Sequence, residues 1–152
     1  MLDIKDKILD ISVTNEDGEH FDFNNLINKK FILYFYPKDD TPGCTKEALS
    51  FSENIEVFNN LGYSIIGVSK DDASKHKKFI KKYKLNFTLI SDENLDLCKM
   101  FNVWVEKSMY GKKYMGIERS TFLIHQNFEI IKSWLKVKVS GHTEEIIDYI
   151  SN

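Results

Sequence analysis

The chain has 152 residues, of which 42% are hydrophobic and 13% aromatic, enough for a single domain over residues 1–152. Its formal net charge of -2 and its pI near 6.1 give no electrostatic reason to expect nucleic acid or an anionic membrane as a partner. The N-terminal segment has no basic start followed by an apolar run, and no stretch approaches the roughly 18 apolar residues of a spanning helix. Only two cysteines are present, Cys44 and Cys98. With no secretory signal, this predicts a reducing compartment, the cytoplasm.

Strands and helices alternate through the first two-thirds of the chain. Alternating residues 9–13, a turn at 16–19 and residues 21–23 predict an N-terminal β-hairpin. Residues 31–36 form a continuous apolar run, which is typical of a strand buried on both faces. The remaining predicted elements are a helix over 41–60, a strand over 63–69, a helix over 72–84, a strand over 87–90 and a helix over 93–101. This order predicts a mostly parallel sheet with helices on its faces.

The pattern changes after residue 102. Residues 103–117 contain glycine and several lysines without a clear period, and we expect an irregular excursion there. Residues 119–125 and 129–137 predict an antiparallel pair, and 141–150 a closing helix. The fold class is therefore α/β, with a thioredoxin-like central mixed β-sheet flanked by helices and an N-terminal β-hairpin.

Cys44 lies where the buried strand gives way to a helix. Thr41 is a good N-cap residue and Pro42 suits the first helical position, so Cys44 falls in the first turn. A helix start offers free N–H groups and a positive dipole end, both of which favour the nucleophilic thiolate. Alternatively, Cys44 is a small buried residue beneath an aromatic strand. The local sequence leaves both interpretations open.

Arginine usage favours the reactive thiol. Among 21 lysines and arginines, Arg119 is the only arginine. Lysine cannot replace the planar, permanently charged guanidinium, so Arg119 is expected to have a specific role rather than to form an ordinary salt bridge. Glu47 follows Cys44 by one helical turn and would oppose a thiolate if it pointed inward. Lys46 or a distant arginine is therefore needed as a counterweight.

The other polar residues predict no further site. The two cysteines and the histidines lack the spacing of metal ligands, so we expect no metal and no cofactor. The histidines, at positions 20, 76, 125 and 142, are expected at the surface or in turns. Asp39 and Asp40 are adjacent in a loop, where turn formation explains them better than a catalytic pair does.

Several motifs together resemble a known family. The spacing Pro37-x-x-x-Thr41-x-x-Cys44 matches the peroxiredoxin active-site pattern. Residues 35–45, FYPKDDTPGCT, are similar to the bacterioferritin comigratory protein (peroxiredoxin Q) branch of that family. Residues 86–92, 102–107 and 116–124 also resemble this branch, so that the resemblance covers nearly the whole chain.

The resemblance implies an antioxidant enzyme, a thiol-dependent peroxidase acting on hydrogen peroxide and alkyl hydroperoxides. Cys44 would be the peroxidatic cysteine, and Thr41 would hydrogen-bond the peroxide oxygens. Arg119 would stabilise the thiolate and the polarised O–O bond, while Pro37 would shield the pocket from water. The usual reductant in the family is thioredoxin, and a monomer without bound cofactor is expected.

The chain departs from the pattern at the resolving cysteine. Many members of the branch carry it five residues after the peroxidatic one, where this chain has Leu49, and the helix over 72–84 holds none either. Cys98 remains, but Leu95 and Phe101 share its helical face and predict that it packs into the core. We therefore expect a one-cysteine cycle, with pairing of Cys44 and Cys98 after local unfolding as the alternative.

Two other functions are weighed against the peroxidase. A general thiol–disulfide oxidoreductase would ordinarily carry a C-x-x-C pair, which this sequence lacks. A non-enzymatic peroxide sensor or holdase would use oxidation of Cys44 as a signal to a partner. Turnover of more than one equivalent of peroxide would separate an enzyme from a sensor.

Overall fold

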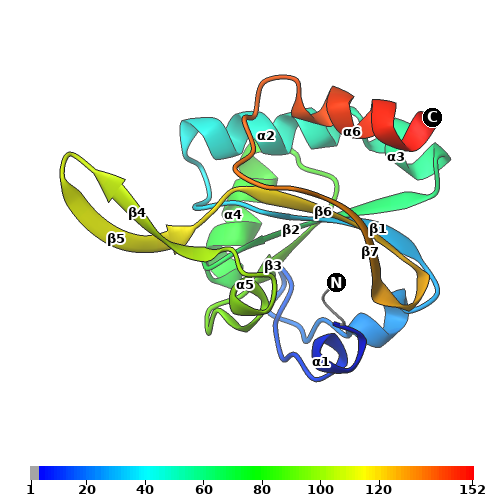
Figure 1. Cartoon of the computed structure of the whole chain (residues 1–152), viewed down its shortest axis with the longest axis horizontal. Helices are drawn as coiled ribbons and strands as arrows, with labels where there is room; N and C mark the ends of the chain where they lie inside the picture. The colour runs from blue at the N-terminus through cyan, green and yellow to red at the C-terminus, as the bar shows by residue number, and fades with distance from the viewer. Residues whose placement is uncertain (1–3) are drawn as a thin grey trace.

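A computed structural model describes residues 4–152 of the chain, with a five-stranded sheet at its centre (Figure 1). The strands are β1 (Lys30–Phe35), β2 (Tyr63–Ser69), β3 (Thr88–Ser91), β6 (Ser120–His125) and β7 (Glu129–Trp134). Their order is β3-β2-β1-β6-β7. The first three strands are parallel, whereas β6 is antiparallel to β1 and β7 is antiparallel to β6. The predicted central mixed sheet is confirmed.

Two apolar cores lie on opposite faces of the sheet. Because side chains alternate along a strand, Phe31, Leu33 and Phe35 join one core, and Ile32 and Tyr34 join the other. The helices are α1 (Lys5–Leu9), α2 (Pro42–Glu53), α3 (Ile55–Asn60), α4 (Ala73–Tyr83), α5 (Asp96–Met100) and α6 (His142–Ser151). Helices α1 and α5 cover the first core, and α2, α3, α4 and α6 cover the second. Figure 1 shows α2, α3 and α6 together on one side of the sheet and α1 on the other.

The N-terminal β-hairpin is only vestigial. Leu9 ends helix α1. Ile8 in this helix and Ile4, the residue just before it, bury their side chains one turn apart. The hairpin pairing is reduced to a single antiparallel bridge between Thr14 and His20. The Asn15 side chain accepts hydrogen bonds from the backbone of residues 17 and 19, which favours a local turn over extended pairing. After this turn the chain enters a short 3₁₀ helix, Phe23–Leu26.

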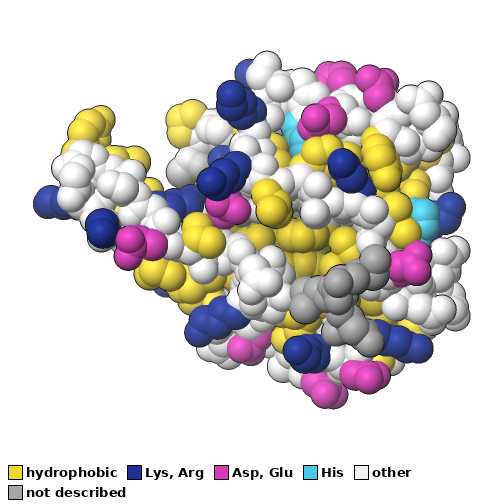
Figure 2. All heavy atoms as spheres, viewed as in Figure 1, with side chains coloured by type: hydrophobic (Ala, Val, Ile, Leu, Met, Phe, Trp, Pro, Cys, Tyr) yellow, Lys and Arg dark blue, Asp and Glu magenta, His cyan; other side chains and the backbone are white. Residues whose placement is uncertain are grey.

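The expectation of an irregular excursion over residues 103–117 is wrong. These residues form an antiparallel hairpin, β4 (Trp104–Met109) and β5 (Lys112–Ile117), that projects from the body of the molecule (Figures 1 and 2). Tyr110 and Gly111 make its turn, both with positive φ. Most of the hairpin is exposed on both faces, so its sequence lacks the apolar alternation by which a half-buried strand is predicted.

The other boundaries differ little from those predicted. The helix expected over 41–60 is two helices, because Asn54 leaves helical geometry and its side-chain amide donates to the Ser50 carbonyl. Asp72 caps α4 at its start, and Lys84 ends it in the left-handed region. The antiparallel pair after Arg119 and the closing helix are confirmed. Within residues 4–152, no helix is both long and apolar enough to cross a membrane.

Candidate active site

Cys44 is the third residue of α2, at the point where the chain leaves the centre of the sheet. Thr41 is the residue before the helix, with the extended backbone of an N-cap, and Pro42 begins the helix as predicted. The N–H of Thr45 donates to the Thr41 carbonyl at 2.8 Å and closes the first turn. The Cys44 side chain points into the core beneath α2, and the residue is only 2% exposed.

The Thr41 side chain does not cap the helix as its position predicts. Its hydroxyl instead donates to the Lys38 carbonyl at 2.9 Å, within the loop that joins β1 to α2. A hydroxyl that donates in this way still has lone pairs on its oxygen. The Thr41 oxygen can therefore accept a further hydrogen bond.

Arg119 links the sulfur of Cys44 to a buried carboxyl group. Its Nη2 donates to Cys44 Sγ at 3.3 Å, and its Nη1 donates to Glu47 Oε1 at 2.7 Å. Burial alone would lower the pKa of Arg119, but the negative charges of Glu47 and Cys44 outweigh burial and raise it. The guanidinium therefore stays charged and donates from both of its terminal nitrogens, a pair of contacts that the single ammonium group of lysine does not reproduce.

The backbone around Arg119 and Cys44 permits this close approach. A Cβ atom added to Gly43 would lie 3.3 Å from Nη2 of Arg119, so glycine leaves room for the guanidinium. Arg119 itself lies between β5 and β6, and its carbonyl accepts a hydrogen bond from the N–H of Val137 at 2.9 Å. The arginine is thus fixed at its backbone as well as at its side chain.

Glu47 points inward, which is the case in which the sequence predicts that it needs a counter-charge. Its side chain is 1% exposed, and its Oε2 finds no protein partner among the described residues. Burial raises the pKa of Glu47 to about 7, although the charge of Arg119 opposes this change. Lys46 is exposed, so the counterweight that Glu47 requires is the distant arginine. The hydroxyl of Tyr34 is likewise buried without a partner among residues 4–152.

A second cation, Lys107, approaches the site from the projecting hairpin. It lies on β4, is partly buried, and packs over Gly116 of β5. Burial, followed by the charge of Arg119, lowers the pKa of Lys107, while Cys44 opposes this change. Lys107 was not predicted as a site residue, because its segment shows no periodicity in the sequence.

Pro37 follows β1 directly and is partly exposed. It borders a surface hollow of about 430 Å³ whose other lining residues are Lys38, Lys70, Asp71, Asp72, Lys75 and Glu93. Cys44 does not line this hollow. The structure thus brings Arg119 into contact with Cys44. Pro37, in contrast, is exposed toward a hollow that Cys44 does not line.

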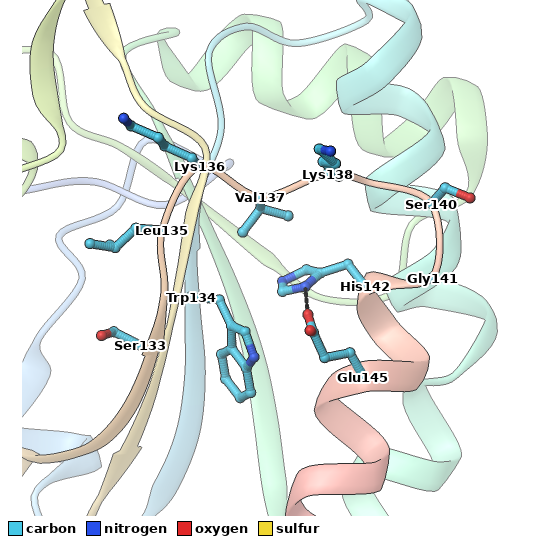
Figure 3. Close-up of a pocket in the computed structure, with 10 residues that line it drawn as sticks. All are labelled: Ser133, Trp134, Leu135, Lys136, Val137, Lys138, Ser140, Gly141, His142 and Glu145. Atoms are coloured by element: carbon cyan, nitrogen blue, oxygen red, sulfur yellow. Dashed lines mark hydrogen bonds and ion pairs between the residues drawn. The ribbon is translucent and has the colours of Figure 1, made fainter.

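A hollow of about 480 Å³ lies between the segment after β7 and the start of α6 (Figure 3). His142 lines it, with Nδ1 3.1 Å from Glu145 Oε1 and Nε2 2.8 Å from the Thr121 hydroxyl. Val137, whose N–H holds the Arg119 carbonyl, lines it as well. The hollow does not reach Cys44. Through the hydrogen bond from Val137, the wall of this hollow holds the backbone of Arg119 in place.

The prediction that all four histidines lie at the surface or in turns is wrong for two of them. His76 is completely buried in α4, and His142 is 3% exposed at the start of α6. His76 precedes Phe79 by three residues and therefore shares the buried face of α4, a spacing visible in the sequence. Both histidines make side-chain hydrogen bonds that make their burial possible.

Cys98 is completely buried in α5, as predicted from its neighbours. Its backbone N–H donates to the carboxylate of Asp92 at 2.8 Å, and burial together with the Asp92 charge raises the pKa of the Cys98 thiol far above its usual value. Cys98 belongs to the core on the opposite face of the sheet from Cys44. Leu49 packs against the Cys44 core, at the position where the branch often has a resolving cysteine.

Comparison with known proteins agrees with this geometry. Residues 4–133 match the AhpC/TSA family. The chain is 46% identical over 136 residues to a putative peroxiredoxin bcp of Coxiella burnetii, covering 90% of each chain. It is 44% identical to the peroxiredoxin Bcp of Bacillus subtilis, covering 99% of this chain and 96% of that one. The chain therefore belongs to the AhpC/TSA family, in its peroxiredoxin Q branch, a class of thiol peroxidases.

Solved structures confirm the thioredoxin-like fold of the peroxiredoxin type. A structure of Xanthomonas campestris peroxiredoxin Q superposes with a TM-score of 0.90 at 38% identity, covering 96% of this chain and 92% of that one. Another, described as a trapped intermediate/ligand complex bearing on alkyl peroxide reduction by the X. campestris bacterioferritin comigratory protein, has a TM-score of 0.90 at 37% identity. It covers 96% of this chain and 93% of that one.

Proposed function

We propose that Cys44 is the peroxidatic residue of a thiol peroxidase that reduces hydrogen peroxide and alkyl hydroperoxides. The observation that carries this assignment is the fork of Arg119, which contacts Cys44 Sγ and Glu47 Oε1 at once. The hydrogen bond from Nη2 stabilises a negatively charged sulfur. The same guanidinium would meet a peroxide that reaches this sulfur.

The reaction is an in-line displacement. The Cys44 thiolate attacks the terminal peroxide oxygen, an S–O bond forms, and the O–O bond breaks. The leaving hydroxide or alkoxide takes up a proton and departs as water or an alcohol. Sulfur is oxidised by two electrons to the sulfenic acid, and the peroxide is reduced. Arg119 stabilises the charge that develops on the breaking O–O bond, and Thr41 accepts a hydrogen bond from the peroxide.

Pro37 is assigned the shielding of Cys44 from water, by the part of its ring that does not open on the surface hollow. Its ring fixes the backbone before the loop that carries Thr41, and it has no N–H to compete for the peroxide. The 2% exposure of Cys44 supports a sheltered reaction centre. No step requires a metal or an organic cofactor.

Reduction of the sulfenic acid is assigned to an external thiol. One thiol condenses with it to a mixed disulfide and water, and a second thiol releases Cys44 and forms a disulfide of the reductant. Cys98 is completely buried on the other face of the sheet, and Leu49 occupies the usual resolving position, both of which support a one-cysteine cycle. Thioredoxin is the proposed physiological donor, and the enzyme is proposed to act as a monomer in the cytoplasm.

Peroxide turnover with dithiothreitol tests the assignment. We expect the wild type and Cys98→Ser to consume many equivalents of hydrogen peroxide, and Cys44→Ser to consume none. A wild type that stops after one equivalent would indicate a peroxide sensor or holdase instead. Activity in an insulin-reduction assay would indicate a general thiol–disulfide oxidoreductase.

A further inference from the structure

A second buried polar cluster lies behind the loop that joins β1 to α2. It consists of Tyr36, Asp39, Asp71 and His76, each no more than 9% exposed. The Tyr36 hydroxyl donates to Asp39 Oδ1 at 2.5 Å, and His76 Nδ1 lies 2.6 Å from Asp39 Oδ2. The backbone N–H of Asp39 donates to Asp71 Oδ2 at 2.8 Å. Asp39, in the middle of the loop, is therefore held at its side chain and its backbone.

The partners of His76 determine where its protons lie. Nε2 is 2.9 Å from the carbonyl oxygen of Ile90, which can only accept, so Nε2 carries a proton. Nδ1 faces the carboxyl group of Asp39, and a hydrogen bond there requires a further proton between the two groups. The pair thus shares one proton in a buried site, where hydrogen bonds are strong and their loss is costly.

Asp39, Asp71 and His76 place three possible metal-ligand atoms within 4.8 Å of one another. Each of these groups is already engaged, because Asp71 Oδ2 also accepts from the Ser69 hydroxyl at 2.8 Å. Hydrogen bonds among the residues therefore account for the arrangement. The cluster is a network that connects the loop to α4, β2 and β3.

The next residue of the loop is tied to the same helix. Asp40 has a φ of 58°, in the left-handed region, and accepts hydrogen bonds from Lys82 Nζ at 2.8 Å and the Tyr83 hydroxyl at 2.6 Å. Both loop aspartates are thus anchored to α4. Thr41 follows directly, its hydroxyl bound to the Lys38 carbonyl of the same loop, and Cys44 is three residues further on.

We propose that His76 is a positioning residue for peroxide reduction. Through its shared proton with Asp39, it holds the loop so that Thr41 faces the peroxide that Cys44 attacks. This inference rests on the proposed function of Cys44 and adds a residue that touches neither the sulfur nor the substrate. Misplacement of a reacting or positioning group by about 1 Å is enough to slow a reaction by orders of magnitude.

Two electrophiles separate positioning from general disruption. Hydrogen peroxide requires Thr41 and Arg119 in place, whereas alkylation by iodoacetamide requires only an accessible Cys44 thiolate. His76→Leu removes the hydrogen bonds of the ring to Asp39 and Ile90, together with the longer contact with the Tyr36 hydroxyl. We expect it to lower the rate constant for peroxide by about tenfold or more and that for iodoacetamide by less than about twofold. His76→Asn, whose amide can still donate to Asp39, should restore most of the peroxide rate.

His20→Leu is the matched control, because His20 is exposed, and it should react like the wild type with both electrophiles. Asp39→Ala removes the carboxylate that accepts these hydrogen bonds in the loop, and it should give the same selective loss of the peroxide reaction. If His76→Leu does not fold, the result for Asp39→Ala tests the inference. The inference is overturned if both His76→Leu and Asp39→Ala match the wild type, or if the variants lose both reactions equally. A wild type that does not react with peroxide would refute the proposed function instead.

Discussion

The buried carboxyl group of Glu47 makes the stability of this protein depend on pH in an unusual direction. Most carboxyl groups in folded proteins gain partners that lower their pKa, whereas burial raises the pKa of Glu47 from 4.5 to about 7. The folded state therefore binds more protons than the unfolded state between these values. As the pH rises through this window, Glu47 loses its proton less readily in the folded protein, and the free energy of unfolding falls.

The size of the effect follows from the two pKa values. At about 1.36 kcal/mol for each pKa unit, ionisation of Glu47 costs the folded protein about 3 kcal/mol once the pH exceeds 7. Glu47→Gln removes the ionisable group and keeps its shape. We expect the stability of the variant relative to the wild type to increase by about 3 kcal/mol between pH 4.5 and about pH 8.

Urea unfolding of the reduced proteins at several pH values measures this difference directly. Glu53→Gln, an exposed change on the same helix, is the matched control and should leave the pH dependence of the wild type in place. The reasoning about Glu47 fails if the difference between Glu47→Gln and the wild type is the same at every pH. It also fails if the difference shrinks as the pH rises.

Three substitutions around the sulfur test the geometry of the site, each read as the rate constant for hydrogen peroxide in stopped-flow measurements. Arg119→Lys keeps the charge but loses the paired contact with Cys44 and Glu47, so we expect the rate constant to fall by about 100-fold or more. A rate constant near that of the wild type would contradict the role of the guanidinium. Thr41→Val removes the hydroxyl and should slow the reaction by about 10- to 100-fold, with Thr41→Ser retaining most of the rate. Gly43→Ala places a Cβ atom 3.3 Å from Arg119 Nη2 and should slow the reaction by a few fold without loss of stability, since alanine favours the helix; an unchanged rate would show that the guanidinium yields without cost.

Local and periodic features of the fold could be predicted from the sequence. The run over residues 31–36 and the Thr-Pro start of α2 predicted a buried strand and a helix with Cys44 in its first turn, and both are present. The hairpin β4–β5 could not be predicted, because a projecting hairpin exposed on both faces has no apolar period. The alternation over residues 9–13 misled in the opposite way, since Leu9 ends helix α1 and the expected hairpin pairing is reduced to the bridge between Thr14 and His20.

Long-range pairs in the site were only partly accessible from the sequence. The need of Glu47 for a counter-charge was visible, and so was the isolation of Arg119 among the lysines. That Arg119 reaches both Glu47, 72 positions away, and the sulfur of Cys44 depends on the antiparallel placement of β6 beside β1. The network around His76 was not predicted, because the histidines were tested only for the spacing of metal ligands. The position of His76 on the buried face of α4, three residues before Phe79, would have indicated its burial.

Intact-mass analysis after one equivalent of hydrogen peroxide tests the central claim most directly. In a one-cysteine enzyme, Cys44 gains one oxygen as a sulfenic acid. We expect this mass increase in both the wild type and Cys98→Ser. Loss of two hydrogens in the wild type but not in Cys98→Ser would show a disulfide between Cys44 and Cys98. That result would contradict a cycle in which an external thiol reduces Cys44 directly.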